Sequence, residues 1–317
     1  MASTLQPVAP TSEVVQTGIT VIIPTLERPS LAQAKKSIEA QTLKADKILY
    51  MSGPGDPVSK IREALKQTDT EFVAIGDDDI IYPEGWLEAM MDVMKSDEKV
   101  GFVGGSMLPM SQIKDASESE KLVAFVLGSW FGTTNMSQRV KIKQKVEPRD
   151  ETNMVGCGLA RTALVKEIFA KDDVIPSFHD TWMIYRIREM GYRTMYSPKA
   201  FFYHATRTNL LSLMRQMMRC GSGRMGFFRQ YPREMLRKFY ILFPMFFVVY
   251  LIGFFVLNWF NVMVVTGWPL ILYVLMDIGV VWMQKKPWKL TLYYAGMHVS
   301  YGFGELLGLV RSVRHWT

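Results

Sequence analysis

The sequence predicts an α/β fold with a mostly parallel, Rossmann-like sheet, followed by a C-terminal region of transmembrane helices. Short apolar strands alternate with helical segments in the first part of the chain, and three consecutive aspartates, Asp77–Asp79, directly follow one of these strands. A long apolar stretch without charges begins at Phe239. Strands that alternate with helices favour a parallel sheet whose ligand crevice lies at the carboxyl ends of the strands. A chain of 317 residues is long enough for one such domain and an appended membrane module.

The predicted strands and helices alternate from residue 19 onward. Ile19–Ile23 is a β-branched strand, and a helix over Ser30–Ala40 follows it, with Ser30 as a suitable N-cap. Lys47–Met51 is the second strand, and a helix over Arg62–Gln67 leads to the third strand, Phe72–Ile75. The polar residues at the carboxyl ends of these strands are Thr25, Glu27, Ser52 and Asp77–Asp79.

The three aspartates indicate a divalent cation. Adjacent carboxylates repel one another, and Mg²⁺ and Mn²⁺ prefer hard oxygen ligands and bridge carboxylates to substrate phosphates. The alternative is a solvated acidic turn that caps a helix beginning near Pro83, with Asp79 or Glu84 at its N-terminus. The position of Asp77–Asp79 at a strand end favours the metal site.

Further motifs follow the aspartates along the chain. The segments concerned are Ile23-Pro24-Thr25, Asp77-Asp78-Asp79, Gly128–Gly132, Gly156-Cys157-Gly158, His179-Asp180 and Arg215–Arg224. In this order they resemble the family 2 glycosyltransferases with the GT-A fold, over roughly residues 18–230. The last segment is similar to the Arg-Gln-x-x-Arg-Tyr-Gly-x-Gly-Arg block of membrane-bound exopolysaccharide glycosyltransferases of the succinoglycan type.

The resemblance implies metal-dependent transfer of a hexose from a UDP- or GDP-sugar. Asp77 and Asp79 would hold Mn²⁺ or Mg²⁺ on the donor diphosphate, and His204 is either a third metal contact or a structural residue. Where the family often has an aspartate after the second strand, this chain has Ser52–Asp56, which departs from the usual pattern for base recognition. The donor-binding residues that the resemblance implies are Pro24, Thr25, Glu27, Arg62, Asp77 and Asp78.

The resemblance also implies a general base. Asp180 matches the second acid of the family's catalytic pair, which removes the proton of the acceptor hydroxyl during an inverting displacement. His179 stands where the family has the preceding acid, and it could tune Asp180 or contact the acceptor. The alternative is that Asp180 only N-caps a helix over Thr181–Met190.

A third group of residues would contact the acceptor or the diphosphate. Gln216 and Arg219 resemble the Gln-x-x-Arg-Trp region of membrane-bound synthases, with Cys220 in place of the aromatic residue. Arg224 follows two glycines that would let the backbone approach an anion. The alternative for this stretch is a basic face on anionic lipid headgroups. The residues that the resemblance assigns here are His179, Trp182, Gln216, Arg219 and Arg224, although Trp182 is equally suited to the core.

Charge and hydropathy indicate a membrane rather than nucleic acid as the partner of the basic region. The formal net charge is +7, and the segment Arg207–Lys238 holds seven arginines and one lysine against one acid. A nucleic-acid patch would fit such a cluster, but apolar segments follow it at residues 239–260, 262–283 and, more weakly, 290–310. The first two match the ~30 Å thickness of a bilayer core.

Basic residues predict the orientation of these segments. They precede the first span and follow the second at Lys285–Lys289, whereas the loop around Asn261 has none. This predicts an integral protein of the cytoplasmic membrane with its catalytic domain in the cytoplasm. The predicted regions are a disordered tail (1–17), a GT-A domain (18–205), basic amphipathic juxtamembrane helices (206–238) and a transmembrane region (239–317).

Two functions remain open at this point. The first is an inverting glycosyltransferase that uses a polyprenyl-linked or polysaccharide acceptor. The second is a non-catalytic GT-A-like scaffold subunit of an envelope-polysaccharide complex. The carboxylates at Asp77–Asp79 and Asp180 favour the enzyme.

Overall fold

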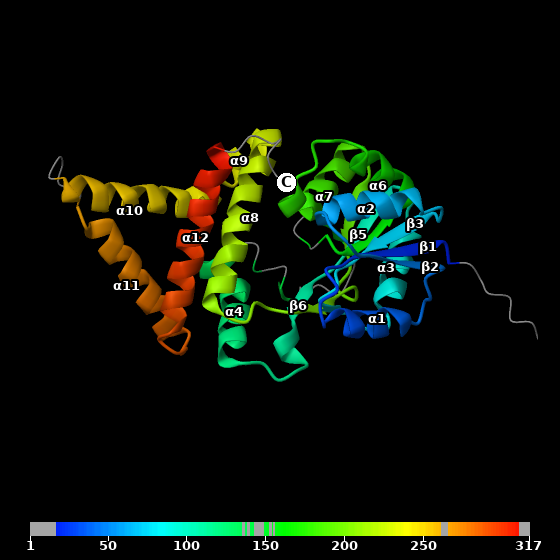
Figure 1. Cartoon of the computed structure of the whole chain (residues 1–317), viewed down its shortest axis with the longest axis horizontal. Coiled ribbons are helices and arrows are strands. Elements are labelled where there is room, and N and C mark those ends of the chain that lie inside the picture. Colours follow the sequence, from blue (N-terminus) through cyan, green and yellow to red (C-terminus); the bar gives the residue numbers. More distant parts are fainter. Residues whose placement is uncertain are drawn as a thin grey trace, which may run out of the picture.

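The computed structural model consists of an α/β unit and a C-terminal group of helices (Figure 1). It describes residues 17–134, 137, 140–142, 149–151, 154, 156–260 and 266–310. The predicted tail lies outside the described residues except for Thr17.

A seven-stranded mixed sheet forms the centre of the α/β unit. Its order is β2-β1-β3-β8-β5-β9-β7, and only β8 and β7 run antiparallel to their neighbours. The predicted α/β fold is therefore confirmed, and the sheet is mixed, with two reversed strands that the sequence did not indicate. The strands are β1 (Ile19–Pro24), β2 (Lys47–Met51), β3 (Phe72–Ile75), β5 (Val100–Gly104), β7 (Arg149–Asp150), β8 (Gly158–Arg161) and β9 (Arg193–Tyr196).

Helices cover both faces of this sheet because side chains along each strand alternate between the faces. Ile22 and Val73 point to the face covered by α2, α6 and α7, whereas Val21 and Ala74 point to the face covered by α1 and α3. The helices are α1 (Leu31–Glu39), α2 (Pro57–Lys66), α3 (Trp86–Met94), α6 (Thr162–Phe169) and α7 (His179–Glu189).

A small second sheet brings a distant histidine to the aspartates. It consists of β4 (Ile80–Ile81), β10 (Phe202–His204) and β6 (Met107–Pro109), with β10 in the middle. The register pairs His204 with Ile80, and the backbone N–H of Ala205 donates to the carbonyl of Asp79 at 3.0 Å. His204 therefore lies beside Asp79.

The helices α8 and α12 stand side by side next to the α/β unit (Figure 1). They cross closely, since a Cβ on Gly221 would lie 2.2 Å from the carbonyl oxygen of Tyr301, and one on Gly304 would lie 2.1 Å from that of Met218. Together with α4 they enclose an apolar cluster of their own. The helices on this side of the α/β unit are α4 (Glu118–Gly128) and α5 (Trp130–Thr133), from the middle of the chain, and α8 (Leu210–Gln230), α9 (Pro232–Arg237) and α12 (Leu290–Val310).

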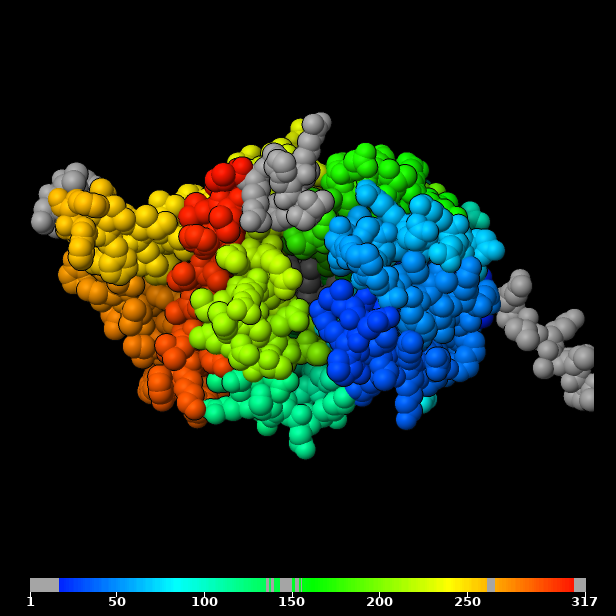
Figure 2. Space-filling view, viewed as in Figure 1, coloured from blue at the N-terminus to red at the C-terminus, as the bar shows by residue number. Residues whose placement is uncertain are grey.

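Two apolar helices, α10 (Phe243–Trp259) and α11 (Trp268–Met283), form a hairpin that opens toward α12 (Figure 1). Their yellow and orange side chains occupy the left-hand edge of the space-filling view (Figure 2). Among the described residues, one helical segment, Phe239–Trp259, is long and apolar enough to cross a membrane. With 16 residues, α11 is shorter, and α12 packs on α8 and α4. The sequence predicts three spans, whereas one helix of the described residues is long and apolar enough to cross a membrane. One such helix is weak evidence for transmembrane helices.

Candidate active site

Two aspartates and one histidine converge at the carboxyl end of β3. One ligand atom from each of Asp77, Asp79 and His204 lies within 4.8 Å of the others. The Nε2 atom of His204 is 3.2 Å from Oδ1 of Asp79, while its Nδ1–H donates to the carbonyl of Ala205 at 2.7 Å. A carbonyl on one ring nitrogen fixes the orientation of a metal-binding histidine and leaves the other nitrogen for the ion. The donor set therefore fits a divalent cation.

Electrostatics within this cluster separate the two aspartates. Burial favours the neutral form of Asp79, but the hydrogen bond and charge of His204, with Arg207 and Arg28, outweigh it and lower the pKa of this carboxyl. Burial likewise opposes protonation of His204, yet Asp79 and Asp77 raise its pKa above the ordinary value. Burial raises the pKa of Asp77, because the positive field of His204 compensates it less. Asp79 and His204 therefore stabilise each other's charged forms, whereas burial disfavours the charged form of Asp77.

The middle aspartate points to the loop after β1. Oδ2 of Asp78 accepts from the Thr25 hydroxyl at 2.7 Å and from the backbone N–H of Leu26 at 3.0 Å. The Thr25 carbonyl in turn accepts from the buried ammonium of Lys60 at 2.7 Å. The N–H of Glu27, whose φ is +56°, donates to the Thr25 hydroxyl. Asp78 and Lys60 therefore fix the loop that carries the predicted nucleoside contacts, which begins at Pro24.

Two residues to which the sequence assigned no role in the site, Tyr82 and Cys157, hold Asp77. The hydroxyl of Tyr82 donates to the Asp77 carbonyl at 3.0 Å and accepts from its N–H at 2.9 Å. A Cβ on Gly76 would lie 2.1 Å from that hydroxyl oxygen, which explains the glycine before the aspartates. The thiol of Cys157 donates to Oδ2 of Asp77 at 3.3 Å.

Asp180 lies in the first turn of α7, close to the metal cluster. The N-cap position of α7 is Phe178, so the alternative that Asp180 is only an N-cap residue is wrong. A Cβ on Gly156 would lie 2.1 Å from Cβ of Asp180, which shows how closely the segment before β8 passes this aspartate. Burial raises the pKa of the Cys157 thiol, and the charges of Asp77, Asp180 and Asp79 raise it further. The structure thus gathers the predicted base and the predicted metal ligands around one thiol.

His179 and the polar residues at the start of α8 border the same region. Nδ1 of His179 donates to the carbonyl of Pro176 at 2.8 Å. Nε of Arg207 donates to Oε1 of Gln216 at 3.1 Å, while Arg219 is exposed on α8. A cavity of about 140 Å³ lies between β6, α4 and α8, and His204, Arg207 and Gln216 are among its lining residues.

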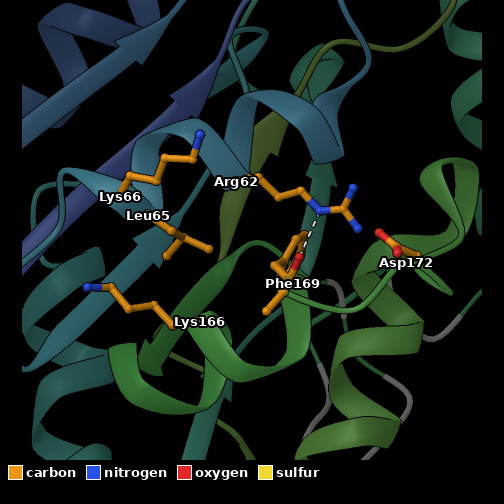
Figure 3. Close-up of a pocket in the computed structure, with 7 residues that line it drawn as sticks. Arg62, Leu65, Lys66, Lys166, Phe169 and Asp172 are labelled. Atoms are coloured by element: carbon orange, nitrogen blue, oxygen red, sulfur yellow. Dashed lines mark hydrogen bonds between the residues drawn. The ribbon is translucent and has the colours of Figure 1, made fainter.

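Three predicted site residues lie elsewhere. Arg62 lines a different pocket, of about 410 Å³, between α2 and α6, where its Nε donates to the carbonyl of Phe169 at 2.7 Å (Figure 3). Trp182 is 0% exposed in the core, and its indole N–H donates to Gln230, so it has no surface for a sugar ring.

Arg224 also lies away from the metal cluster, inside helix α8. It is 5% exposed, its guanidinium lies 4.4 Å from the ring centroid of Phe178, and its Nε donates to the Tyr301 hydroxyl at 3.3 Å. The neighbouring glycine, Gly221, serves the close crossing with α12 instead of an approach to an anion. The prediction of glycine-assisted anion binding at Arg224 is therefore wrong.

The family model described as glycosyltransferase like family 2 matches residues 37–223. The chain belongs to this family. The match includes the aspartates, Asp180, His204 and Gln216. A comparison with curated proteins found no significant match.

A comparison with solved structures bears on the fold. This glycosyltransferase resembles a mannosyltransferase from Pyrobaculum calidifontis in complex with GDP-Man and Mn²⁺, with a TM-score of 0.57 at 13% identity over 94% of this chain and 88% of that one. A second likeness is to glucosyl-3-phosphoglycerate synthase from Mycobacterium tuberculosis in complex with Mg²⁺ and UDP, at TM-score 0.41 and 10% identity over 67% and 78% of the chains. The first likeness supports the GT-A-like α/β fold; the second is too weak to add to it.

Proposed function

We propose that this family 2 glycosyltransferase is an inverting, metal-dependent enzyme that moves a hexose from a nucleotide sugar to a polyprenyl-linked or polysaccharide acceptor at the cytoplasmic face of the membrane. The observation that carries the proposal is the convergence of Asp77, Asp79 and His204 at a strand end, with Asp180 on the adjacent helix.

The donor would bind between the β1 loop and the aspartates. Mn²⁺ or Mg²⁺ held by Asp77, Asp79 and His204 would offset the charge that develops on the departing diphosphate. The chain supplies further positive charge from Arg28, 3.6 Å from Asp79, and from Arg207. Pro24, Thr25 and Glu27 would line the nucleoside pocket, in a loop held by Asp78 and Lys60.

Asp180 would act as the general base. Its carboxylate takes the proton of the acceptor hydroxyl as the oxygen attacks the anomeric carbon and the bond to the diphosphate oxygen breaks. One displacement inverts the anomeric configuration. His179, next to Asp180, would contact the acceptor, and Gln216, Arg219 and Arg207 would hold the diphosphate or the acceptor.

The apolar hairpin supports the proposed class of acceptor. Exposed apolar side chains on α10 and α11, with basic residues at Arg233–Lys238 and Lys285–Lys289, suit insertion into an anionic bilayer with both helix ends at one surface. A catalytic unit held there meets lipid-linked acceptors at a high effective concentration. Membrane-bound exopolysaccharide synthesis of the succinoglycan type is therefore the proposed setting.

A donor screen with the full-length protein tests the proposal. Purified protein is given UDP- and GDP-sugars with Mn²⁺, with Mg²⁺ or with a chelator, and release of the nucleotide is measured with and without membrane extracts as the acceptor source. We expect one donor to be consumed only with metal, and a product with the opposite anomeric configuration. No consumption of any donor, despite Mn²⁺ binding, would favour the non-catalytic scaffold instead.

A further inference from the structure

Arg28 faces two of the three aspartates from the loop after β1. Its Nη1 lies 3.7 Å from Oδ1 of Asp78 and 3.6 Å from Oδ2 of Asp79. Both distances are longer than a hydrogen bond, so charge rather than a directed bond holds the guanidinium there. The side chain is 45% exposed, and no hydrogen bond joins its N–H groups to another residue that the structure describes.

The carboxylate oxygens that face Arg28 are not those that the neighbouring side chains hold. Oδ2 of Asp78 accepts from the Thr25 hydroxyl, and Oδ1 of Asp79 lies 3.2 Å from Nε2 of His204. The opposite oxygen of each aspartate lies next to one and the same nitrogen of Arg28. Because Asp79 is a proposed metal ligand, a cation bound to it comes close to this guanidinium or displaces it.

Two other basic side chains near the aspartates are held by hydrogen bonds within the chain. The ammonium of Lys60 donates to the Thr25 carbonyl at 2.7 Å, and Nε of Arg207 donates to Oε1 of Gln216 at 3.1 Å. Arg28 differs from both, because its exposed guanidinium is held by charge alone. A guanidinium presents its N–H donors in a planar fork that matches the oxygens of a phosphate. Arg28 is therefore the best placed of the three to exchange the aspartates for a diphosphate.

We propose that Arg28 couples cation binding to donor binding: it opposes the cation while it faces Asp79, and it turns to the diphosphate when the donor binds. The inference rests on the metal and donor sites of the proposed function. Two positive charges beside one carboxylate repel each other, so the cation alone binds weakly. A diphosphate that takes the guanidinium ends this repulsion and strengthens cation binding. Coupling of this kind is reciprocal, so the cation strengthens donor binding by the same factor.

Binding of Mn²⁺ and of nucleotide, measured separately on the full-length protein, tests the coupling. The paramagnetic resonance signal of free Mn²⁺ gives its affinity without nucleotide, and calorimetry with UDP and with GDP at saturating Mn²⁺ gives the nucleotide affinity. We expect Arg28→Gln to bind Mn²⁺ alone at least about fivefold more tightly than wild type and the nucleotide at least about fivefold more weakly. Lys36→Gln removes the same charge from the exposed face of α1 and should match wild type in both measurements.

The opposite signs of these two changes separate the inference from a structural defect, which would weaken both affinities. Mn²⁺ affinity of Arg28→Gln equal to or below that of wild type would overturn the inference and leave the metal site in place. Tighter Mn²⁺ binding with unchanged nucleotide affinity would also overturn it. Arg28→Lys, the second variant, keeps the charge without the planar fork, so it should bind Mn²⁺ like wild type and the nucleotide more weakly. Failure of wild type to bind Mn²⁺ with either nucleotide would defeat both proposals.

Discussion

The α/β unit and the α10–α11 hairpin place their apolar side chains in opposite directions. In the α/β unit Trp86 and Trp182 are 0% exposed, whereas Trp259, Trp268 and Trp282 of the hairpin are 82%, 74% and 79% exposed. Burying a large apolar side chain stabilises the folded state in water by roughly 1.5–3 kcal/mol. The exposed side chains of the hairpin do not make this contribution. The α/β unit therefore buries its large apolar side chains within itself. The hairpin gains this stabilisation only in apolar surroundings or against a partner.

The α/β unit and the hairpin also differ in how they place charged side chains. The α/β unit buries Asp78 and Asp79 at the edge of its sheet and places Arg28 and His204 against them. The hairpin has one charged residue, Asp277, between residues 243 and 283. Catalysis and membrane attachment, as proposed, therefore occupy separate regions of the molecule, so that substitutions should damage one function and spare the other.

The largest expected effect is on transfer itself. Asp180→Asn should lower the transfer rate by about 10²–10⁴-fold, since an amide cannot take the acceptor proton. Donor affinity, measured by calorimetry, should be retained. Asp92→Asn, an exposed aspartate on α3, is the control and should behave as wild type. Substantial transfer by Asp180→Asn would assign the base elsewhere.

The next largest effect distinguishes Asp79, a proposed metal ligand, from Asp78, which holds the loop after β1. Asp79→Asn removes a charged ligand, so we expect weaker Mn²⁺ binding and about 100-fold slower turnover, the equivalent of roughly 3 kcal/mol. Asp78→Asn disturbs the bond to Thr25 and should raise the KM for the donor while Mn²⁺ affinity is retained. Calorimetry with Mn²⁺ alone measures the first effect and steady-state kinetics the second. Normal turnover of Asp79→Asn at low Mn²⁺ would contradict the metal assignment.

The hairpin offers the converse test. Ile252→Lys combined with Leu275→Lys puts charges on exposed apolar positions, each at a cost of about 2.5–3.5 kcal/mol in a bilayer. We expect the protein to leave the membrane fraction in a flotation assay while metal-dependent donor turnover in detergent is unchanged. Leu211→Lys, exposed on α8, is the matched control and should stay with membranes. Full membrane attachment of the double variant would assign the hairpin another partner.

The crossing of α8 and α12 connects the two regions and is expected to be sensitive to size. Gly304→Ala places a methyl group 2.1 Å from the Met218 carbonyl oxygen and should lower the free energy of unfolding by about 1–3 kcal/mol. Gly279→Ala on α11 meets nothing within 4 Å and serves as the control. Thermal unfolding of both variants in the same detergent measures the difference, and equal midpoints would show that the helices separate readily.

The smallest effect is the pH dependence of the Asp79–His204 pair without metal. The raised pKa of His204 gives stability that is fully present below its ordinary value of 6.5 and is lost as pH rises through the folded pKa. The lowered pKa of Asp79 gives stability present above 3.8 and lost as pH falls. With a chelator present, His204→Gln should therefore lower the melting temperature more near pH 6 than near pH 9. An equal effect at both values would show that the pair is not ionised.

Much of the fold and part of the site could be predicted from local sequence. Strands β2 and β3 have the predicted bounds, and Asp77–Asp79 follow β3 as expected, because apolar stretches and the residues that end them are local features. His204 was a candidate ligand from the resemblance alone, and only the pairing of β10 with β4 brings it to Asp79. The apolar character of the segments that form α10 and α11 was also evident from composition.

Tertiary structure decided the rest, because those contacts join segments far apart along the chain. The thiol of Cys157 reaches Asp77 through the antiparallel insertion of β8, and the ammonium of Lys60 reaches Thr25 through the packing of α2. Arg224 is buried because α12 returns to α8 some eighty residues later, although the sequence places a boundary between the two at residue 238. The sequence alone thus determined which chemical groups are present and which strand end bears the aspartates, while long-range packing determined which of those groups meet.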